Sequence, residues 1–158
     1  ERLISPCLKA GALRRVLVMG LSISCKKTGR SIDMGAGGFA ALRERVAMLD
    51  SADWGILYKT LSTPPLLKNK AFYDEFNAKT EKLLKQKKVH IKVVDFCLQT
   101  DISGSIRFGA CQQILKAIGD YDDDVLYGYC GRPDCAKFAD FKRILQDCVD
   151  NRCNMVWD

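Results

Sequence analysis

The sequence predicts a single α/β domain in which short apolar strands alternate with amphipathic helices. Its 158 residues fit one ordinary domain, and 47% of them are hydrophobic, which is enough for a sizeable core. Strands separated by helices are usually joined by crossovers. We therefore expect a three-layer sandwich with a mainly parallel central sheet of four or five strands, flanked by helices on both faces. No linker divides residues 1–158, and the start at Glu1 without a methionine leaves excision from a longer protein open.

The first half of the chain is expected to hold two strands and the helix between them. Residues 13–24 are apolar and end in a glycine and serines, as a strand does, and the loop 25–38 is rich in Gly, Lys and Ser. Apolar residues recur at helical spacing over 38–50. A second apolar strand is expected over 54–61. It ends at 62–65, because adjacent prolines continue neither a strand nor a helix.

The second half is expected to repeat the alternation. Helical spacing of Phe and Leu predicts a long helix, and the run VHIKVVDFC predicts the strand that follows it. A further helix, a strand VLYGYC, a helix that opens at a proline and a short last strand complete the chain. The helices are expected over 70–87, 106–118 and from 133 onward, and the strands over 89–97, 125–130 and 154–158.

The charge of the chain leaves an anionic partner open. Lys and Arg number 25 against 19 Asp and Glu, a net charge of +6. Several lysines lie on or just after the long helix, and they form either a solvated face or a surface that binds an anion such as nucleic acid or phosphate. Acidic residues at 120 and 122–124 make the distribution uneven. The clustered lysines are Lys79, Lys82, Lys85, Lys87 and Lys88.

Eight cysteines and the absence of any Asn-X-Ser/Thr sequon favour free thiols in a reducing compartment. Cys130, Cys135, Cys148 and Cys153 are spaced C-x4-C-x12-C-x4-C, which leaves zinc open. Because Cys148 lies on an apolar helix stripe, we expect core thiols and neither a metal nor a cofactor. No apolar run approaches the length of a membrane span, so we expect a soluble, cytoplasmic protein.

The candidate chemistry surrounds the only histidine. Residues two apart on a strand point to the same side, so His90 and Lys92 are expected to face one pocket. Ser105 and Arg107 follow Gly104 at the next predicted turn. A nucleophilic imidazole that attacks a phosphodiester needs a nearby cation and a hydroxyl that hold the phosphate, and these residue types supply both.

These residues resemble the signature of the phospholipase D superfamily, which is His-X-Lys, four residues, Asp, six residues and Gly-Ser-X-Asn. His90, Lys92, Gly104 and Ser105 match it in type and spacing, and the flanking VLVMGLSIS and DDVLYGYC also look similar. The resemblance implies a single-motif half-domain that pairs as a homodimer and acts on phosphodiesters, with nucleic acid the favoured substrate. It implies His90 as nucleophile or general acid, Lys92 as phosphate clamp and Ser105 as a phosphate contact.

Further phosphate contacts are expected from Gly104, Arg107, Lys85 and Lys88. The chain departs from the family pattern at two places, since Cys97 stands where the family has Asp and Arg107 where it has Asn. A second hypothesis therefore stays open. It is a non-catalytic regulatory module of the same fold, in which His90 is structural and the basic helix or the acidic patch contacts a protein partner.

Two loops allow a further interpretation each. Asp101, Ser103 and Ser105 have the spacing of a von Willebrand A-type metal loop, or they form a capped turn. Residues 35–38 are glycine-rich before a helix, which is typical either of a phosphate-binding loop or of simple loop flexibility.

Overall fold

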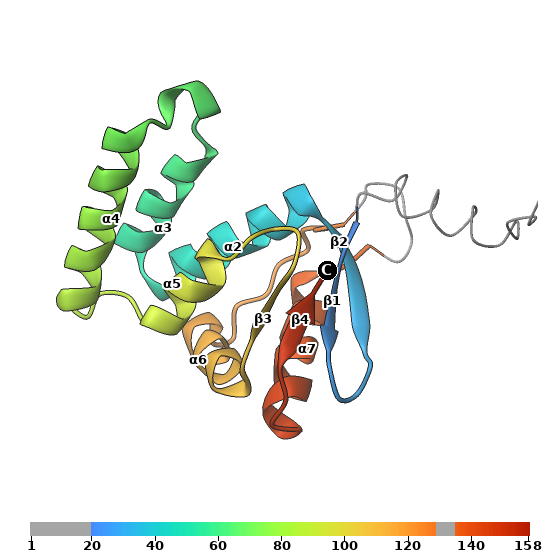
Figure 1. The fold of residues 1–158 in the computed structure, drawn as a ribbon. Coiled ribbons are helices and arrows are strands. Elements are labelled where there is room, and N and C mark those ends of the chain that lie inside the picture. The colour runs from blue at the N-terminus through green and yellow to red at the C-terminus, as the bar shows by residue number, and fades with distance from the viewer. Residues whose placement is uncertain (1–19, 129–134) are drawn as a thin grey trace, which may run out of the picture.

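A computed structural model describes residues 20–128 and 135–158. Its sheet has four strands in the order β2-β1-β4-β3, and every neighbouring pair is antiparallel. The strands are β1 (Gly20–Cys25), β2 (Ser31–Gly35), β3 (Gly104–Ile106) and β4 (Met155–Trp157). The last strand of the chain therefore lies inside the sheet, between β1 and β3 (Figure 1).

The expectation of a mainly parallel sheet is wrong. β1 and β2 form a hairpin whose register runs from Gly20 opposite Gly35 to Ser24 opposite Ser31. The hairpin occupies much of the predicted loop 25–38, and the positive φ of Gly29 (71°) allows its turn. Because a hairpin connection is necessarily antiparallel, no crossover helix joins these strands.

One face of the sheet is buried and the other is polar. Alternate residues of β1, among them Ile23 and Cys25, are fully buried, whereas the serines between them are only half-buried. The same alternation places Trp157 inside and Ser105 outside. Helices α2 and α7 pack against the strands, so the described part of the chain is closer to two layers than to the expected three (Figure 1).

Six α-helices lie in the described residues. Four of them confirm the helices expected over 38–50, 70–87, 106–118 and after 133, with ends shifted by a few residues. The expected opening of the last one at Pro133 lies outside the described residues, and the helix begins at Phe138. The helices are α2 (Ala36–Asp50), α3 (Ala52–Lys59), α4 (Lys70–Lys85), α5 (Ile91–Leu98), α6 (Phe108–Ile118) and α7 (Phe138–Asp150). β4 confirms the last strand, and β1 confirms the described part of the first, whose residues 13–19 lie outside the described range.

The strands expected over 54–61 and 89–97 are wrong, because these segments form α3 and α5. Each is a short apolar run, for which periodicity does not separate a buried strand from a buried helix. Both helices have an N-cap that accepts a backbone N–H bond: the Ser51 hydroxyl from Trp54 and the His90 ring from Lys92. The strand expected over 125–130 is reduced to one isolated bridge between Leu126 and Lys137, and residues 129 and 130 lie outside the described range.

An aromatic cluster forms the centre of the core. Phe96 packs edge-on against Phe39 and Trp157 and stacks on Phe141, with ring centroids about 6 Å apart in each case. These four rings come from α2, α5, α7 and β4, so they tie most of the fold together. The helical pair α3 and α4 lies to one side and contacts the rest mainly through the packing of α3 on α2 (Figure 1).

Candidate phosphate-binding pocket

His90 is the N-cap of α5 and is half-buried. Its Nδ1 accepts the backbone N–H of Lys92 at 3.1 Å, and its own backbone N–H donates to a carboxylate oxygen of Asp50 at 3.2 Å. A neutral imidazole has one proton and one lone pair, so this bond places the proton on Nε2 and occupies the lone pair. Burial raises the pKa of Asp50, and the bond from His90 partly offsets that rise. The ring of His90 is thus engaged in capping a helix.

The structure separates His90 from Lys92. His90 lines a surface pocket of about 660 Å³ beside Asp50, Lys87 and Lys88. Lys92 lines a different pocket of about 460 Å³. The expected strand would have placed both side chains on one side, but residues two apart on a helix are rotated by about 200° from one another.

The second pocket, which we call the Lys92 pocket, brings together three of the predicted site residues. Lys92 comes from the first turn of α5, Ser105 from β3 and Arg107 from the N-cap of α6. Its full lining is Lys92, Asp95, Gln99, Ser105, Ile106, Arg107, Phe108, Gly109 and Ala110.

Two amide side chains that the sequence did not single out hold Ser105 in place. The Gln99 amide accepts the backbone N–H of Ser105 at 3.1 Å and donates to its carbonyl at 3.0 Å, as a neighbouring strand would. The Asn154 amide donates to the Ser105 hydroxyl at 3.4 Å. No local sequence signal predicts the Asn154 contact, because Asn154 and Ser105 are 49 residues apart and meet only through the pairing of β3 with β4.

The Lys92 pocket is electropositive. The ion pairs formed among residues 20–128 and 135–158 include neither Lys92 nor Arg107. The first turn of α6 contains no acidic residue, and its leading backbone N–H groups carry the positive end of the helix dipole. Asp95 is the one carboxylate in the lining, so a positive excess remains.

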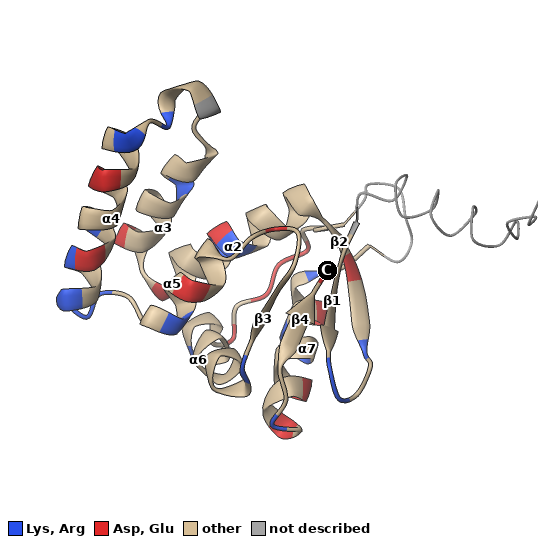
Figure 2. Ribbon diagram, in the orientation of Figure 1, with Lys and Arg blue, Asp and Glu red and all other residues tan. Residues whose placement is uncertain are grey.

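The other predicted phosphate contacts lie elsewhere. Lys85 pairs with Glu81 at 3.9 Å, and Lys88 pairs with Asp53 at 3.1 Å. Figure 2 shows acidic and basic residues alternating along α4, which is typical of a solvated helix face. Gly104 packs under the ring of Trp157, where any side chain would collide, so its glycine is explained by packing.

The place of the family's Asp is occupied by a buried, inert thiol. Burial raises the pKa of Cys97 to about 12, and its Sγ donates weakly to the Arg43 carbonyl at 3.8 Å. A neutral thiol supplies no negative charge to orient an imidazole. Asp101, the first residue of the candidate metal loop, pairs with the buried guanidinium of Arg43 at 3.0 Å.

Comparisons with protein-family models, curated proteins and solved structures give no match. The geometry of the chain is therefore the ground for a functional conclusion. Within the described residues, no helix has the length and apolar character that crossing a membrane requires.

Proposed function

We propose that this domain binds a phosphate-containing ligand in the Lys92 pocket, without catalysis by His90. The observation that supports this is the convergence of Lys92, Ser105 and Arg107, from two helices and a strand, on one pocket at the start of α6. The proposal keeps the phosphate chemistry that the phospholipase D resemblance implies, and restricts it to binding.

Each group in the pocket has a defined part in the proposed binding. The Arg107 guanidinium matches two phosphate oxygens with its planar fork, and the Lys92 ammonium adds a second positive charge. The hydroxyl of Ser105 and the first N–H groups of α6 contribute neutral hydrogen bonds. Within the described residues the side-chain hydrogen-bond partner of the Ser105 hydroxyl is the Asn154 amide, which is not a base and does not activate a nucleophile, so the set fits binding rather than hydrolysis.

The test is a binding titration with inorganic phosphate and with a short oligonucleotide, with and without a 5′ phosphate, at low and high salt. We expect Lys92→Ala and Arg107→Ala each to weaken binding about tenfold at low salt, the loss of one charge-assisted bond. Lys82→Ala is the matched control, because Lys82 is an exposed lysine on α4 outside this pocket. Equal weakening by Lys82→Ala would show non-specific attraction and overturn the proposal.

Hydrolysis is tested separately with His90→Asn. Asparagine is a good N-cap, so this variant keeps the cap while it removes the imidazole. We expect it to bind phosphate as the wild type does, and neither protein to cleave a model phosphodiester. Cleavage by the wild type that is lost in His90→Asn would contradict the proposal and support the catalytic hypothesis.

A further inference from the structure

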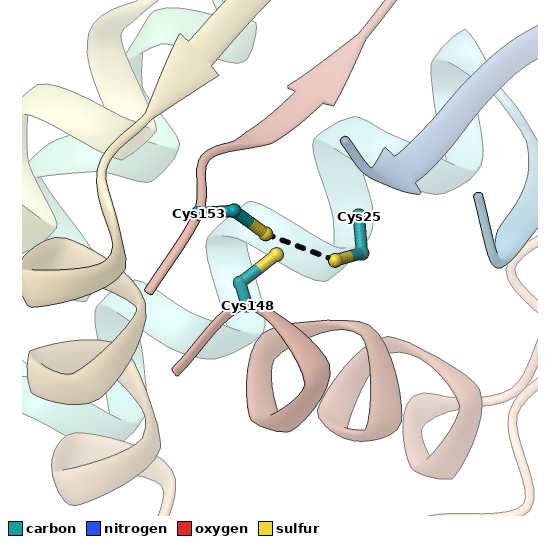
Figure 3. A group of neighbouring side chains, drawn as sticks. All are labelled: Cys25, Cys148 and Cys153. Atoms are coloured by element: carbon teal, nitrogen blue, oxygen red, sulfur yellow. Dashed lines mark hydrogen bonds between the residues drawn. The ribbon is translucent and has the colours of Figure 1, made fainter. Parts of the chain in front are cut away.

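Three cysteine thiols converge between the sheet and α7. Cys25 ends β1, Cys148 lies in the last turns of α7, and Cys153 follows that helix. Their sulfur atoms all lie within 4.8 Å of one another, and the Cys25 and Cys153 sulfurs are 3.1 Å apart (Figure 3). Cys25 and Cys148 are fully buried, and Cys153 is half-buried.

A fourth thiol adjoins this group. Cys111 is fully buried on α6, which packs against α7. Interaction of the Cys111 and Cys148 thiols lowers the pKa of Cys111 and raises that of Cys148, although the Cys111 sulfur lies outside the 4.8 Å that encloses the other three. Cys25 and Cys111 come from parts of the chain distant from Cys148 and Cys153, so their convergence is a property of the fold.

The hairpin turn after Cys25 directs hydrogen-bond donors at the sulfur. Burial acts to raise the pKa of Cys25, but the hydroxyl and backbone N–H of Thr28, the Cys153 thiol and the backbone N–H of Lys27 together bring it down to about 7. Burial and the Cys25 thiol raise the pKa of Cys153, and the backbone N–H of Lys27 partly offsets that rise. Such donors stabilise a thiolate rather than a thiol, and packing of neutral cysteines in a core does not require them.

We propose that Cys25, Cys111, Cys148 and Cys153 together bind one structural Zn²⁺ ion. Tetrahedral zinc with bonds of about 2.3 Å places its sulfur ligands about 3.8 Å apart. The three closest sulfurs lie within 4.8 Å of one another, and those of Cys25 and Cys153, 3.1 Å apart, need only a small separation to reach this spacing. The Cys111 sulfur, which lies outside that group, has to move toward the ion. Binding displaces the thiol protons to solvent, and no bond is oxidised or reduced.

The chemistry of the site favours zinc in a structural role. Thiolates are soft ligands that select zinc over magnesium or calcium. Three of the four cysteines are fully buried, so the site is closed and leaves no open position for a substrate. The ion would join the β1–β2 hairpin to α6, α7 and the start of β4, and so add to the strand pairing of β1 with β4 and to the Arg30–Asp147 ion pair.

A disulfide between Cys25 and Cys153 is the competing outcome. The 3.1 Å between their sulfurs exceeds a disulfide bond of about 2.0 Å, and closing it requires an oxidant that removes two hydrogens. It would also leave Cys111 and Cys148 without a common partner. Intact-mass measurement without reductant separates the two outcomes, because only the disulfide lowers the mass of the metal-free chain by two hydrogens.

The test combines metal analysis with Co²⁺ substitution on the wild-type chain, kept reduced. We expect one zinc per chain, and with Co²⁺ the thiolate charge-transfer and tetrahedral d–d absorption bands, which added Zn²⁺ abolishes. Cys148→Ala and Cys153→Ala should lose these bands. Cys97→Ala, which deletes an equally buried thiol outside the cluster, should keep them at full intensity.

Thr28→Ala tests the site without a change in the core, because Thr28 is exposed. Loss of its bond to Cys25 should lower the affinity for Zn²⁺ about tenfold, as for other residues that support a metal ligand, with the stoichiometry unchanged. The proposal is overturned if the reduced wild type gives no tetrahedral Co²⁺ spectrum, if Cys148→Ala binds as the wild type does, or if the reduced chain re-forms the Cys25–Cys153 disulfide in preference to binding zinc.

Discussion

Arg43 carries the charge most deeply buried among the described residues, with 1% of its surface exposed. Its guanidinium donates to the carbonyls of Cys97 (3.3 Å), Gln99 (2.6 Å) and Thr100 (3.0 Å), which surround the end of α5. It also lies 4.1 Å from the centre of the Phe39 ring. Arg43 therefore holds the segment that leads from α5 into β3.

Arg43→Met keeps most of the side-chain volume and removes the donors. The Thr100 carbonyl still accepts the indole N–H of Trp157 at 3.0 Å, but the carbonyls of Cys97 and Gln99 lose their Arg43 donor. Each orphaned carbonyl costs about 1–3 kcal/mol, and release of the buried guanidinium returns part of this. We expect the free energy of unfolding to fall by about 3 kcal/mol, or about 6–12 °C in melting temperature for a chain of this length.

The assay is urea unfolding of wild type, Arg43→Met and Asp101→Asn, followed by circular dichroism and tryptophan fluorescence. The Asp101 side chain is 52% exposed, so its ion pair with Arg43 should contribute less than about 1 kcal/mol. Arg43→Met within 1 kcal/mol of wild type would refute the carbonyl-capping role. Equal losses from both variants would show that the ion pair, and not the capping, stabilises the loop.

Three further predictions follow from single contacts. Gly38→Ala places a methyl group against the Tyr127 carbonyl and should lower the free energy of unfolding by about 2–4 kcal/mol. Gly37→Ala places its methyl group in open space and should raise that free energy by about 0.5–1 kcal/mol. Equal effects of the two variants in thermal unfolding would exclude the clash. Because burial raises the pKa of Cys97 from 9.0 to about 12, its thiol contributes stability below pH 9 that is lost as the pH rises to 12. Unfolding free energy should therefore fall more steeply over that range in wild type than in Cys97→Ala, and parallel curves would contradict it. His90→Ala should cost about 1 kcal/mol of stability and His90→Asn only a few tenths, measured by urea unfolding; similar losses would argue against the cap.

The helices that the sequence predicted correctly are those with more than ten residues of regular apolar spacing. α3 and α5 have eight residues each, and in so short a run the helical and strand patterns coincide. Their caps, Ser51 and His90, were the available signals, and a histidine is not a residue that capping preferences emphasise. The antiparallel sheet was missed because β2 lies in a stretch whose glycines and lysines are typical of a loop.

The candidate sites show the same limit. Lys92, Ser105 and Arg107 were grouped by motif spacing and do line one pocket, but the helical turn of α5 moves His90 out of it. Among the cysteines, spacing grouped Cys148 with Cys153, and the fold brings these two together. Cys25 and Cys111 join them only because β1 pairs with β4 and α6 packs on α7, which no local pattern encodes.

The two proposed sites meet at one point of the backbone, and this makes their independence testable. Cys153 is a proposed zinc ligand, and the next residue, Asn154, donates to the Ser105 hydroxyl in the Lys92 pocket. An ion that fixes Cys153 should therefore also fix Asn154, so that phosphate affinity is higher in the zinc-bound than in the zinc-free protein. Thermodynamic linkage requires that phosphate then raises the affinity for zinc by the same factor. Both factors are measured by titrating phosphate with and without saturating zinc, and zinc with and without saturating phosphate. Equal phosphate affinities with and without zinc would show that the strand pairing of β3 and β4 alone positions Ser105, and that the zinc site stabilises the fold without acting on the pocket.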